Sequence, residues 1–207
     1  MDREALNFSY DKIMEMEQRY RATFINSLTG FKSLALVGTI GKSGGTNLAV
    51  FNSIVHLGAH PPLVGMVIRP DSVDRHTLQN ILETGYYTIN HVQESFMQQA
   101  HQTSARYPKE ISEFEAVGLT KEFISDFSAP FVHESVIKVG VEFKEKIPFA
   151  INGTVFVIGE IKQVILPKAS IHADGFIDLV YAGTITNSGL DSYHSVSSGK
   201  RFPYAKP

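Results

Sequence analysis

Residues 39–90 read TIGKSGGTNLAVFNSIVHLGAHPPLVGMVIRPDSVDRHTLQNILETGYYTIN, and the rest of the chain is organised around them. In order, this stretch offers a glycine-rich turn, a segment of small residues (46–53) and a Pro61-Pro62 step into an apolar run. A group of basic and hydroxyl side chains follows: Arg69, Arg75, His76 and Thr77. Small residues let backbone N–H groups approach a flat ring closely, and basic groups bind anions. The order therefore suits a ligand with a polar ring at one end and an anion at the other.

The anion end of this pattern coincides with the expected start of a helix. Residues 71–74 offer N-cap side chains, 75–83 have helical spacing, and Gly85 supplies a stop. A phosphate there would accept bonds from the Thr77 hydroxyl and from the free N–H groups of the first turn, aided by the helix dipole. Arg69 could reach the same anion with its planar guanidinium. The alternative is a solvent-exposed helix start whose charges happen to be basic.

Apolar periodicity on both sides of this stretch predicts a mainly β protein with peripheral helices. Strands are expected over residues 34–40, 46–57, 63–69, 86–92, 132–143, 154–166 and 176–181. Helices are expected over about 9–26, 75–83 and 94–106, and the first should pack one face on the β structure. Residues 110–127 are polar and irregular, and residues 183–207 predict a C-terminal loop segment. Without an internal repeat or a linker, residues 1–207 are expected to form one domain.

Composition excludes several classes of function. A net charge of −2 without a basic run gives no electrostatic reason to expect nucleic acid, and no apolar segment has the length of a membrane span. The absence of cysteine excludes disulfides, iron–sulfur clusters and thiolate zinc sites. The first twenty residues are charged and lack the apolar core of a signal peptide, so we expect the protein in the cytoplasm.

Several loose motifs in a fixed order resemble the flavin reductase-like family of FMN-binding split β-barrels. They are Asn26-Ser27-Leu28-Thr29-Gly30, Asn47-Leu48-Ala49 running into Phe51-Asn52-Ser53, Pro61-Pro62-Leu63, Arg69, and Arg75-His76-Thr77-Leu78-Gln79-Asn80-Ile81. The tail, 201–207, reads RFPYAKP and also resembles one branch of the family. The similarity covers roughly residues 18–207. It implies a split β-barrel with peripheral helices and FMN as the cofactor.

The resemblance also assigns the two ends of the proposed ligand. Oxidised flavin presents acceptors at N1, O2, O4 and N5 and a donor at N3, so its pocket needs backbone N–H groups, an amide or hydroxyl, and a carbonyl. The expected ring contacts are Thr46, Asn47, Phe51, Asn52 and Ser53. The expected phosphate contacts are Arg69, Arg75, His76 and Thr77. An ordinary strand with buried, satisfied polar residues would have much the same sequence at the ring end.

Members of this family are usually homodimers with the flavin at or near the subunit interface. The resemblance therefore implies that Tyr193, and also His172, approach the flavin of the other subunit. A Gly/Ser-rich tail that ends with Phe202 and Tyr204 fits a segment ordered by a partner chain.

The resemblance implies an oxidoreductase that passes electrons from NAD(P)H through FMN to a small-molecule acceptor. One departure keeps an alternative open. Flavin reductases that use NADH tend to carry Gly-Asp-His before their long strand, where this chain has Asn152-Gly153-Thr154. A non-enzymatic, electron-carrying FMN module is therefore the alternative. A third interpretation is a non-haem iron oxygenase, in which His172, Asp174 and His194 would form the facial triad of ligands. A turn is the simpler interpretation of His172-Ala173-Asp174, so we expect no metal site.

Overall fold

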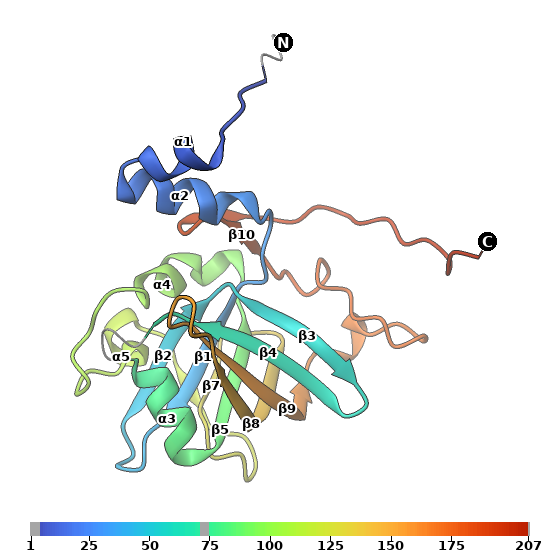
Figure 1. Cartoon of the computed structure of the whole chain (residues 1–207). Helices are drawn as coiled ribbons and strands as arrows, with labels where there is room; N and C mark the ends of the chain where they lie inside the picture. Colours follow the sequence, from blue (N-terminus) through green and yellow to red (C-terminus); the bar gives the residue numbers. More distant parts are fainter. Residues whose placement is uncertain (1–4, 71–74, 207) are drawn as a thin grey trace.

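A single large sheet carries the fold (Figure 1). The computed structural model describes residues 5–70 and 75–206. The strands of this sheet are β1 (Ala35–Ile40), β2 (Thr46–Phe51), β3 (Ile54–Ala59), β4 (Pro62–Ile68), β5 (Tyr86–His91), β8 (Lys138–Pro148) and β9 (Val155–Ile165). They lie in the order β2-β1-β5-β8-β9-β4-β3, and every neighbouring pair is antiparallel. The mainly β prediction is confirmed.

The sheet curls because its two edge strands are consecutive in the chain. Only Asn52 and Ser53 separate β2 from β3, although seven strands at a spacing of about 4.8 Å would place the edges of a flat sheet roughly 29 Å apart. Two residues cannot span that distance. The prediction of one strand over residues 46–57 is therefore wrong, because the chain leaves one edge at Asn52 and begins the other edge at Ile54. Among the described strands no ladder joins β2 to β3, so the curled sheet stays split there.

Strand β1, which lies second from the β2 edge of the sheet, is buried on both faces, which explains its continuous apolar run. Successive side chains of a strand point to opposite faces. Ala35 and Val37 belong to one core cluster, which residues of β4, β5, β8, β9 and the helix that begins at His76 complete. Leu34 and Leu36 belong to a second cluster, in which they meet residues of the helical segments that follow β5: Phe96, Ala100 and Phe114. Helices thus cover the outer face of the sheet next to β2.

Helix α3 (His76–Thr84) lies beside β1 and β2 and ends at Gly85, whose φ of 79° is the left-handed conformation of a helix C-cap. This confirms the predicted helix over residues 75–83. The predicted N-cap residues 71–74 lie outside the described part of the chain. The helix expected over 94–106 is shorter and has two parts, η1 (Glu94–Phe96) and α4 (Met97–Gln102). A further short helix, α5 (Glu113–Val117), lies within the irregular segment 110–127.

The C-terminal third differs from the prediction in three places. Residues 132–143 do not form one strand, because β7 (Phe131–Val132) pairs with β6 (Lys121–Glu122) and β8 begins only at Lys138. Residues 176–181, predicted as a strand, hold only one isolated antiparallel bridge, from Ile177 to Ile171, followed by a turn; they come after the short helix η2 (Lys168–Ser170). The tail, predicted as a loop, contains a hairpin of β10 (Thr186–Ser188) and β11 (Ser192–His194).

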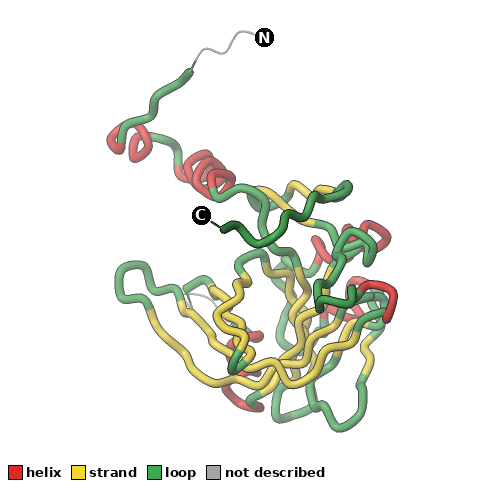
Figure 2. The backbone as a smooth tube through the Cα atoms, turned by 90° about the vertical axis from the view of Figure 1, so that its right-hand side faces the viewer, coloured by secondary structure: helices red, strands yellow, loops and turns green. Residues whose placement is uncertain are grey.

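The N-terminal segment forms an arm, defined here as residues 5–31, that stands clear of the sheet (Figures 1 and 2). It holds α1 (Tyr10–Glu15) and α2 (Gln18–Leu28), with a break where the Glu17 carboxylate accepts hydrogen bonds from the N–H groups of Arg19 and Tyr20. Neither helix has a buried residue, so the prediction of one helix packed on the β structure is wrong. Within residues 5–70 and 75–206, no helix has both the length and the apolar character needed to cross a membrane.

Candidate functional site

A groove of about 1110 Å³ opens beside β2 and the start of α3. Its other walls are the segment after α4 (103–110) and the β10–β11 hairpin. Nine of the ten residues predicted for a ligand line it: Asn47, Phe51, Asn52, Ser53, Arg69, Arg75, His76, Thr77 and Tyr193. The tenth, Thr46, lines an adjoining cavity of about 330 Å³ that also touches Asn47 and His76. The structure thus brings the two ends of the sequence pattern into one space.

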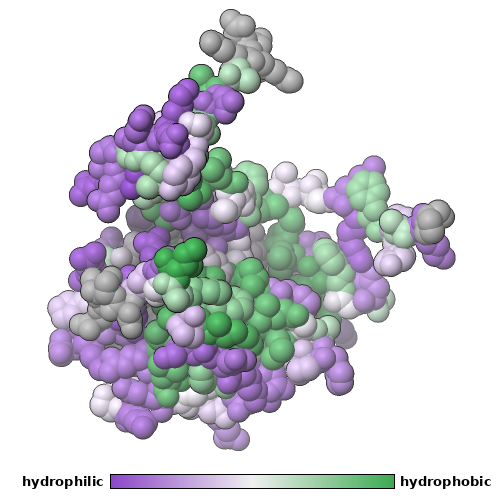
Figure 3. Space-filling model, in the orientation of Figure 1, coloured by the Kyte–Doolittle hydropathy of each residue, from purple (hydrophilic) through white to green (hydrophobic). Residues whose placement is uncertain are grey.

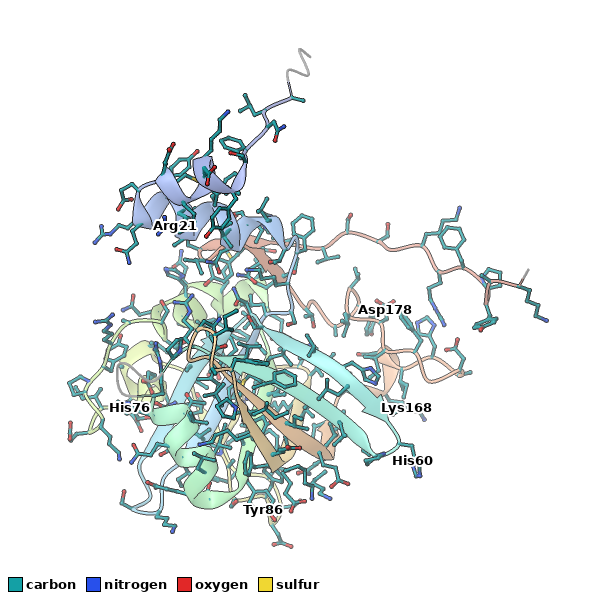
Figure 4. All side chains as sticks on the ribbon, in the orientation of Figure 1. Arg21, His60, His76, Tyr86, Lys168 and Asp178 are labelled. Carbon is teal, nitrogen blue, oxygen red and sulfur yellow. The ribbon has the colours of Figure 1, made fainter. Side chains whose placement is uncertain are left out.

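One end of the groove is built on the first turn of α3. Thr77 is buried, and its Oγ1 accepts a hydrogen bond from Asn47 Nδ2 at 3.0 Å. Arg75 occupies the N-cap position without capping the helix with its side chain, and its Nε donates to Pro70 O at 3.1 Å. The first N–H groups of α3 therefore have no side-chain cap from Arg75, and they carry the positive end of the helix dipole. His76, labelled in Figure 4, lies at this start and lines the same groove as the segment 103–110. Asn47, predicted for the ring, thus lies beside the N-terminus of α3.

A buried carboxylate fixes the strand at this end. Glu113 is only 6% exposed, and its Oε2 accepts a hydrogen bond from the Leu48 backbone N–H at 2.9 Å. Burial raises the pKa of the Glu113 carboxyl, while the bond from Leu48 and the nearby His76 oppose that rise. One residue earlier on α5, Ser112 Oγ lies 2.8 Å from Thr46 Oγ1. Helix α5 therefore holds β2 in register beside α3.

The other end of the groove lies where β2 ends. Asn52 Nδ2 donates to Gly189 O at 3.3 Å, which ties the strand end to the β10–β11 turn. Ser53 Oγ lies 3.4 Å from Asn52 Oδ1. Asn52 follows Asn47 by five residue steps of extended chain, or about 16 Å at 3.3 Å per step. The groove therefore separates an amide-lined end from the helix N-terminus by the length of an elongated small molecule.

Arg69 is exposed and lies close enough to Lys32 to affect it electrostatically. Burial lowers the pKa of Lys32, and the positive charge of Arg69 lowers it further. Lys32 Nζ donates to Gly189 O at 3.4 Å, the same carbonyl that Asn52 contacts. Arg69, predicted for the phosphate, therefore has a second cation and the amide end of the groove as neighbours.

One wall of the groove was not anticipated from the sequence. Residues 103–110 follow α4 and bring Arg106 and Lys109 to the groove, and Lys109 Nζ donates to Gln79 Oε1 at 3.1 Å on α3. His101 Nδ1 lies 2.8 Å from Tyr193 Oη, with the two rings edge to face. Burial, followed by the charge of Asp191, raises the pKa of the Tyr193 hydroxyl. The signal in the sequence was the basic and aromatic character of this segment.

His172 does not line the groove of its own chain. Lys168 and Asp178, which bracket its segment, lie on the other side of β3 and β4 from His76 (Figure 4). His172 Nε2 is 3.8 Å from Asp178 Oδ2, whereas Asp174 pairs with Arg201 at 2.6 Å. His194 Nε2 lies 2.8 Å from Ser188 Oγ in the β10–β11 hairpin. The triad needed for the iron reading is not assembled, and the described residues hold no group of three His, Cys, Asp or Glu side chains placed for a metal.

The turn between β8 and β9 contains the triplet Asn152-Gly153-Thr154. Asn152 Oδ1 accepts hydrogen bonds from Thr154 N at 3.0 Å and from Thr154 Oγ1 at 2.7 Å, so the polar groups of this turn bond to one another. A Cβ added at Gly153 would lie 3.5 Å from Pro70, which places the turn beside the segment after β4. The turn offers no imidazole or carboxylate to that segment.

Comparison with known proteins agrees with this geometry. The family described as flavin reductase like domain matches residues 32–185. The crystal structure of a candidate flavin reductase with a split barrel domain from Shewanella frigidimarina is 54% identical, with a TM-score of 0.94 over 97% of this chain and 100% of that one.

Two relatives of similar sequence are described as uncharacterized proteins. One, from Halalkalibacterium halodurans, is 30% identical over 161 residues, which are 77% of this chain and 75% of that protein. The other, from Aquifex aeolicus, is 28% identical over 119 residues, or 56% of this chain, and the match spans 61% of that protein's length.

Proposed function

The chain belongs to the flavin reductase-like domain family, and from that premise we propose that it is an oxidoreductase that holds FMN in the groove beside β2 and α3. The observation that carries this proposal is the placement of two different binding ends in one groove. The N-terminus of α3 offers N–H groups and cations, and the strand end at Asn52 offers amides.

The donor set of the anion end fits a phosphate monoester. The Thr77 oxygen already accepts a bond from Asn47, so its hydroxyl proton is available to an anion. The first N–H groups of α3 and the His76 side chain face the same space. Arg75 adds a cation at the N-cap position, and Lys109 adds another from the opposite wall. Such a terminus binds phosphate through hydrogen bonds and the helix dipole together.

The ring end fits a flat heteroaromatic group. Ala49 and Ser53 present small side chains along the groove, and Phe51 and Leu190 give it apolar surface. Asn52 is held in place by Gly189, and Asn187 lies on the adjacent hairpin wall. These residues orient the ring, and Tyr193 with His101 limits access from the side of α4. When bound, FMN supplies hydride acceptance and electron transfer, while the protein supplies position and electrostatics.

We propose NADH or NADPH as the electron donor and a small molecule as the acceptor. Rapid mixing of the FMN-loaded protein with each nucleotide tests this directly, because reduction bleaches the visible absorption of flavin. Bleaching by at least one nucleotide, at a rate that saturates with its concentration, is the expected result. If neither nucleotide bleaches the flavin while dithionite does, the donor proposal is wrong.

An electron-carrying module without its own nucleotide site is the second candidate. The observation that favours it is the self-contained turn at Asn152-Gly153-Thr154. Under this alternative, FMN binds with the same contacts, neither nucleotide reduces it, and a partner flavoprotein or an iron–sulfur protein does. The rapid-mixing experiment separates the two candidates.

We also propose that the protein is a homodimer. Figure 3 shows hydrophobic residues over β3 and β4, where Val55 is 48% and Leu57 is 41% exposed. Ile151, at the β8–β9 turn, is 93% exposed, and Tyr204 in the tail is 90% exposed. Exposed apolar patches are typical of protein interfaces. Light scattering after size-exclusion chromatography should give twice the mass of 22.9 kDa, and a monomer mass would contradict the proposal.

A further inference from the structure

Asn187 carries a buried carbonyl that has no partner in the described part of the chain. Its side chain is 1% exposed and lines the groove, and Oδ1 makes no hydrogen bond. Its backbone is fixed on both sides, because Asn187 O accepts from Lys32 N at 2.9 Å and the residue pairs with Tyr193 across the hairpin. The unpaired atom therefore belongs to an ordered strand.

Among the described residues, no other asparagine has a fully buried amide oxygen that lacks a hydrogen-bond partner. Asn47 donates to Thr77, Asn80 donates to Thr39 Oγ1 at 3.1 Å, and Asn90 bonds to three groups through both ends of its amide. A buried acceptor without a donor is costly, and native proteins pair the great majority of such atoms. The exception here lies on the wall of the groove. That position indicates that a bound molecule supplies the missing donor.

We propose that Asn187 Oδ1 accepts a hydrogen bond from N3–H of the flavin ring and so recognises its pyrimidine edge. The atom left over is an acceptor, and N3–H is the one donor that an oxidised flavin ring presents. The neighbouring polar groups at this end are already engaged, because Asn52 Nδ2 donates to Gly189 O. Oδ1 itself has almost no exposed surface, and because rotation about the terminal torsion of an amide is soft, a turn of the Asn187 amide would bring Oδ1 to the groove surface. This inference rests on the proposed function.

Comparing FMN with 3-methyl-FMN tests the proposal, since the methyl group removes the N3 donor and leaves the phosphate unchanged. Quenching of flavin fluorescence gives both dissociation constants. The wild-type protein should bind FMN at least about tenfold more tightly than the methylated analogue. A ratio near one in the wild type would overturn the proposal, while failure to bind FMN at all would instead overturn the proposed function.

Variants assign the effect to the residue. In Asn187→Ala the ratio of the two dissociation constants should fall toward one, because the acceptor is gone and the methyl group has room. In Asn187→Asp, which keeps an acceptor, the ratio should stay at least as large as in the wild type. Ser170→Ala is the matched control, since Ser170 Oγ is also buried and unpaired but lies outside the groove.

A ratio that stays at its wild-type value in Asn187→Ala would overturn the assignment. So would a ratio that collapses in Asn187→Asp, because the contacting atom would then be the amide nitrogen. Circular dichroism establishes that each variant is folded. If Asn187→Ala is unfolded, the Asp variant and the wild-type ratio still decide the outcome.

Discussion

Replacing Thr77 by valine probes the anion end of the groove with the smallest change of shape. Thr77 is 6% exposed, and its Oγ1 accepts a hydrogen bond from Asn47. A hydroxyl has one proton to donate, and in the proposed complex that proton points to the FMN phosphate. Valine keeps the β-branched shape of threonine and removes the hydroxyl. The variant therefore lacks the hydroxyl bond to the phosphate but keeps the start of α3 filled.

A hydrogen bond to a charged group contributes about 1.5–3 kcal/mol, which corresponds to a roughly ten- to 150-fold loss of FMN affinity. The lost partner of Asn47 weakens the free and the bound protein alike, so that part of the cost cancels in the binding measurement. Riboflavin has no phosphate, and its affinity should change by less than about threefold. The ratio of the FMN to the riboflavin dissociation constant is thus the diagnostic quantity.

Titration of each protein into flavin, followed by fluorescence quenching, measures both constants. Thr84→Val is the matched control, because it makes the same change at the other end of the same helix, where Thr84 Oγ1 donates to Asn80 O at 2.9 Å. The control should leave both affinities near their wild-type values. The reasoning is refuted if folded Thr77→Val binds FMN as the wild type does, or if riboflavin binding weakens by the same factor.

Three further predictions concern stability. Gly85→Ala should destabilise the protein by about 1–2 kcal/mol in urea unfolding, because φ at Gly85 is 79°; the added Cβ meets nothing within 4 Å, so the loss comes from the backbone conformation and not from a clash. Gly45→Ala is the control: its Cβ also meets open space, but Gly45 has no positive φ, so it should lose less stability. Equal losses in the two variants would contradict this reasoning. Burial lowers the pKa of His91 from 6.5 to about 4, so on acidification the unfolded chain takes up a proton at this residue before the folded protein does. The stability that neutral His91 contributes is complete above pH 6.5 and is lost as the pH falls to 4. In His91→Gln, the fall in the free energy of unfolding over this range should be smaller than in the wild type by about 3 kcal/mol. Burial raises the pKa of Glu113, so the stability that this carboxyl contributes is present below pH 4.5 and is lost as the pH rises through its pKa in the folded protein. The free energy of unfolding of Glu113→Gln should therefore rise relative to that of the wild type between about pH 4.5 and 7. A difference between the two proteins that does not change with pH would show that the Glu113 carboxyl is not the titrating group.

The sequence predicted the groove better than it predicted the strands around it. Asn47 and Thr77 are 30 positions apart, yet the order of motifs placed both in one site, and they share a hydrogen bond. The pattern could not show at which end of the groove each residue lies. Asn47 was expected at the ring and lies at the helix start, because the two ends of β2 point to opposite ends of the groove.

The errors have separate physical causes. Apolar residues continue from β2 into β3, so periodicity did not register that Asn52 and Ser53 carry the chain from one sheet edge to the other. The β10–β11 hairpin is rich in residues typical of loops, and pairing across the strands orders it nonetheless. The arm has helical spacing, but spacing alone does not say which surface its apolar face contacts.

A crystal structure of the protein grown with excess FMN tests the central claim most directly. We predict the phosphate at the N-terminus of α3 against Thr77, and the ring beside Asn52 and Asn187 in the same groove. A flavin bound elsewhere, or in this groove with its phosphate at Asn52 and its ring at Thr77, would contradict it.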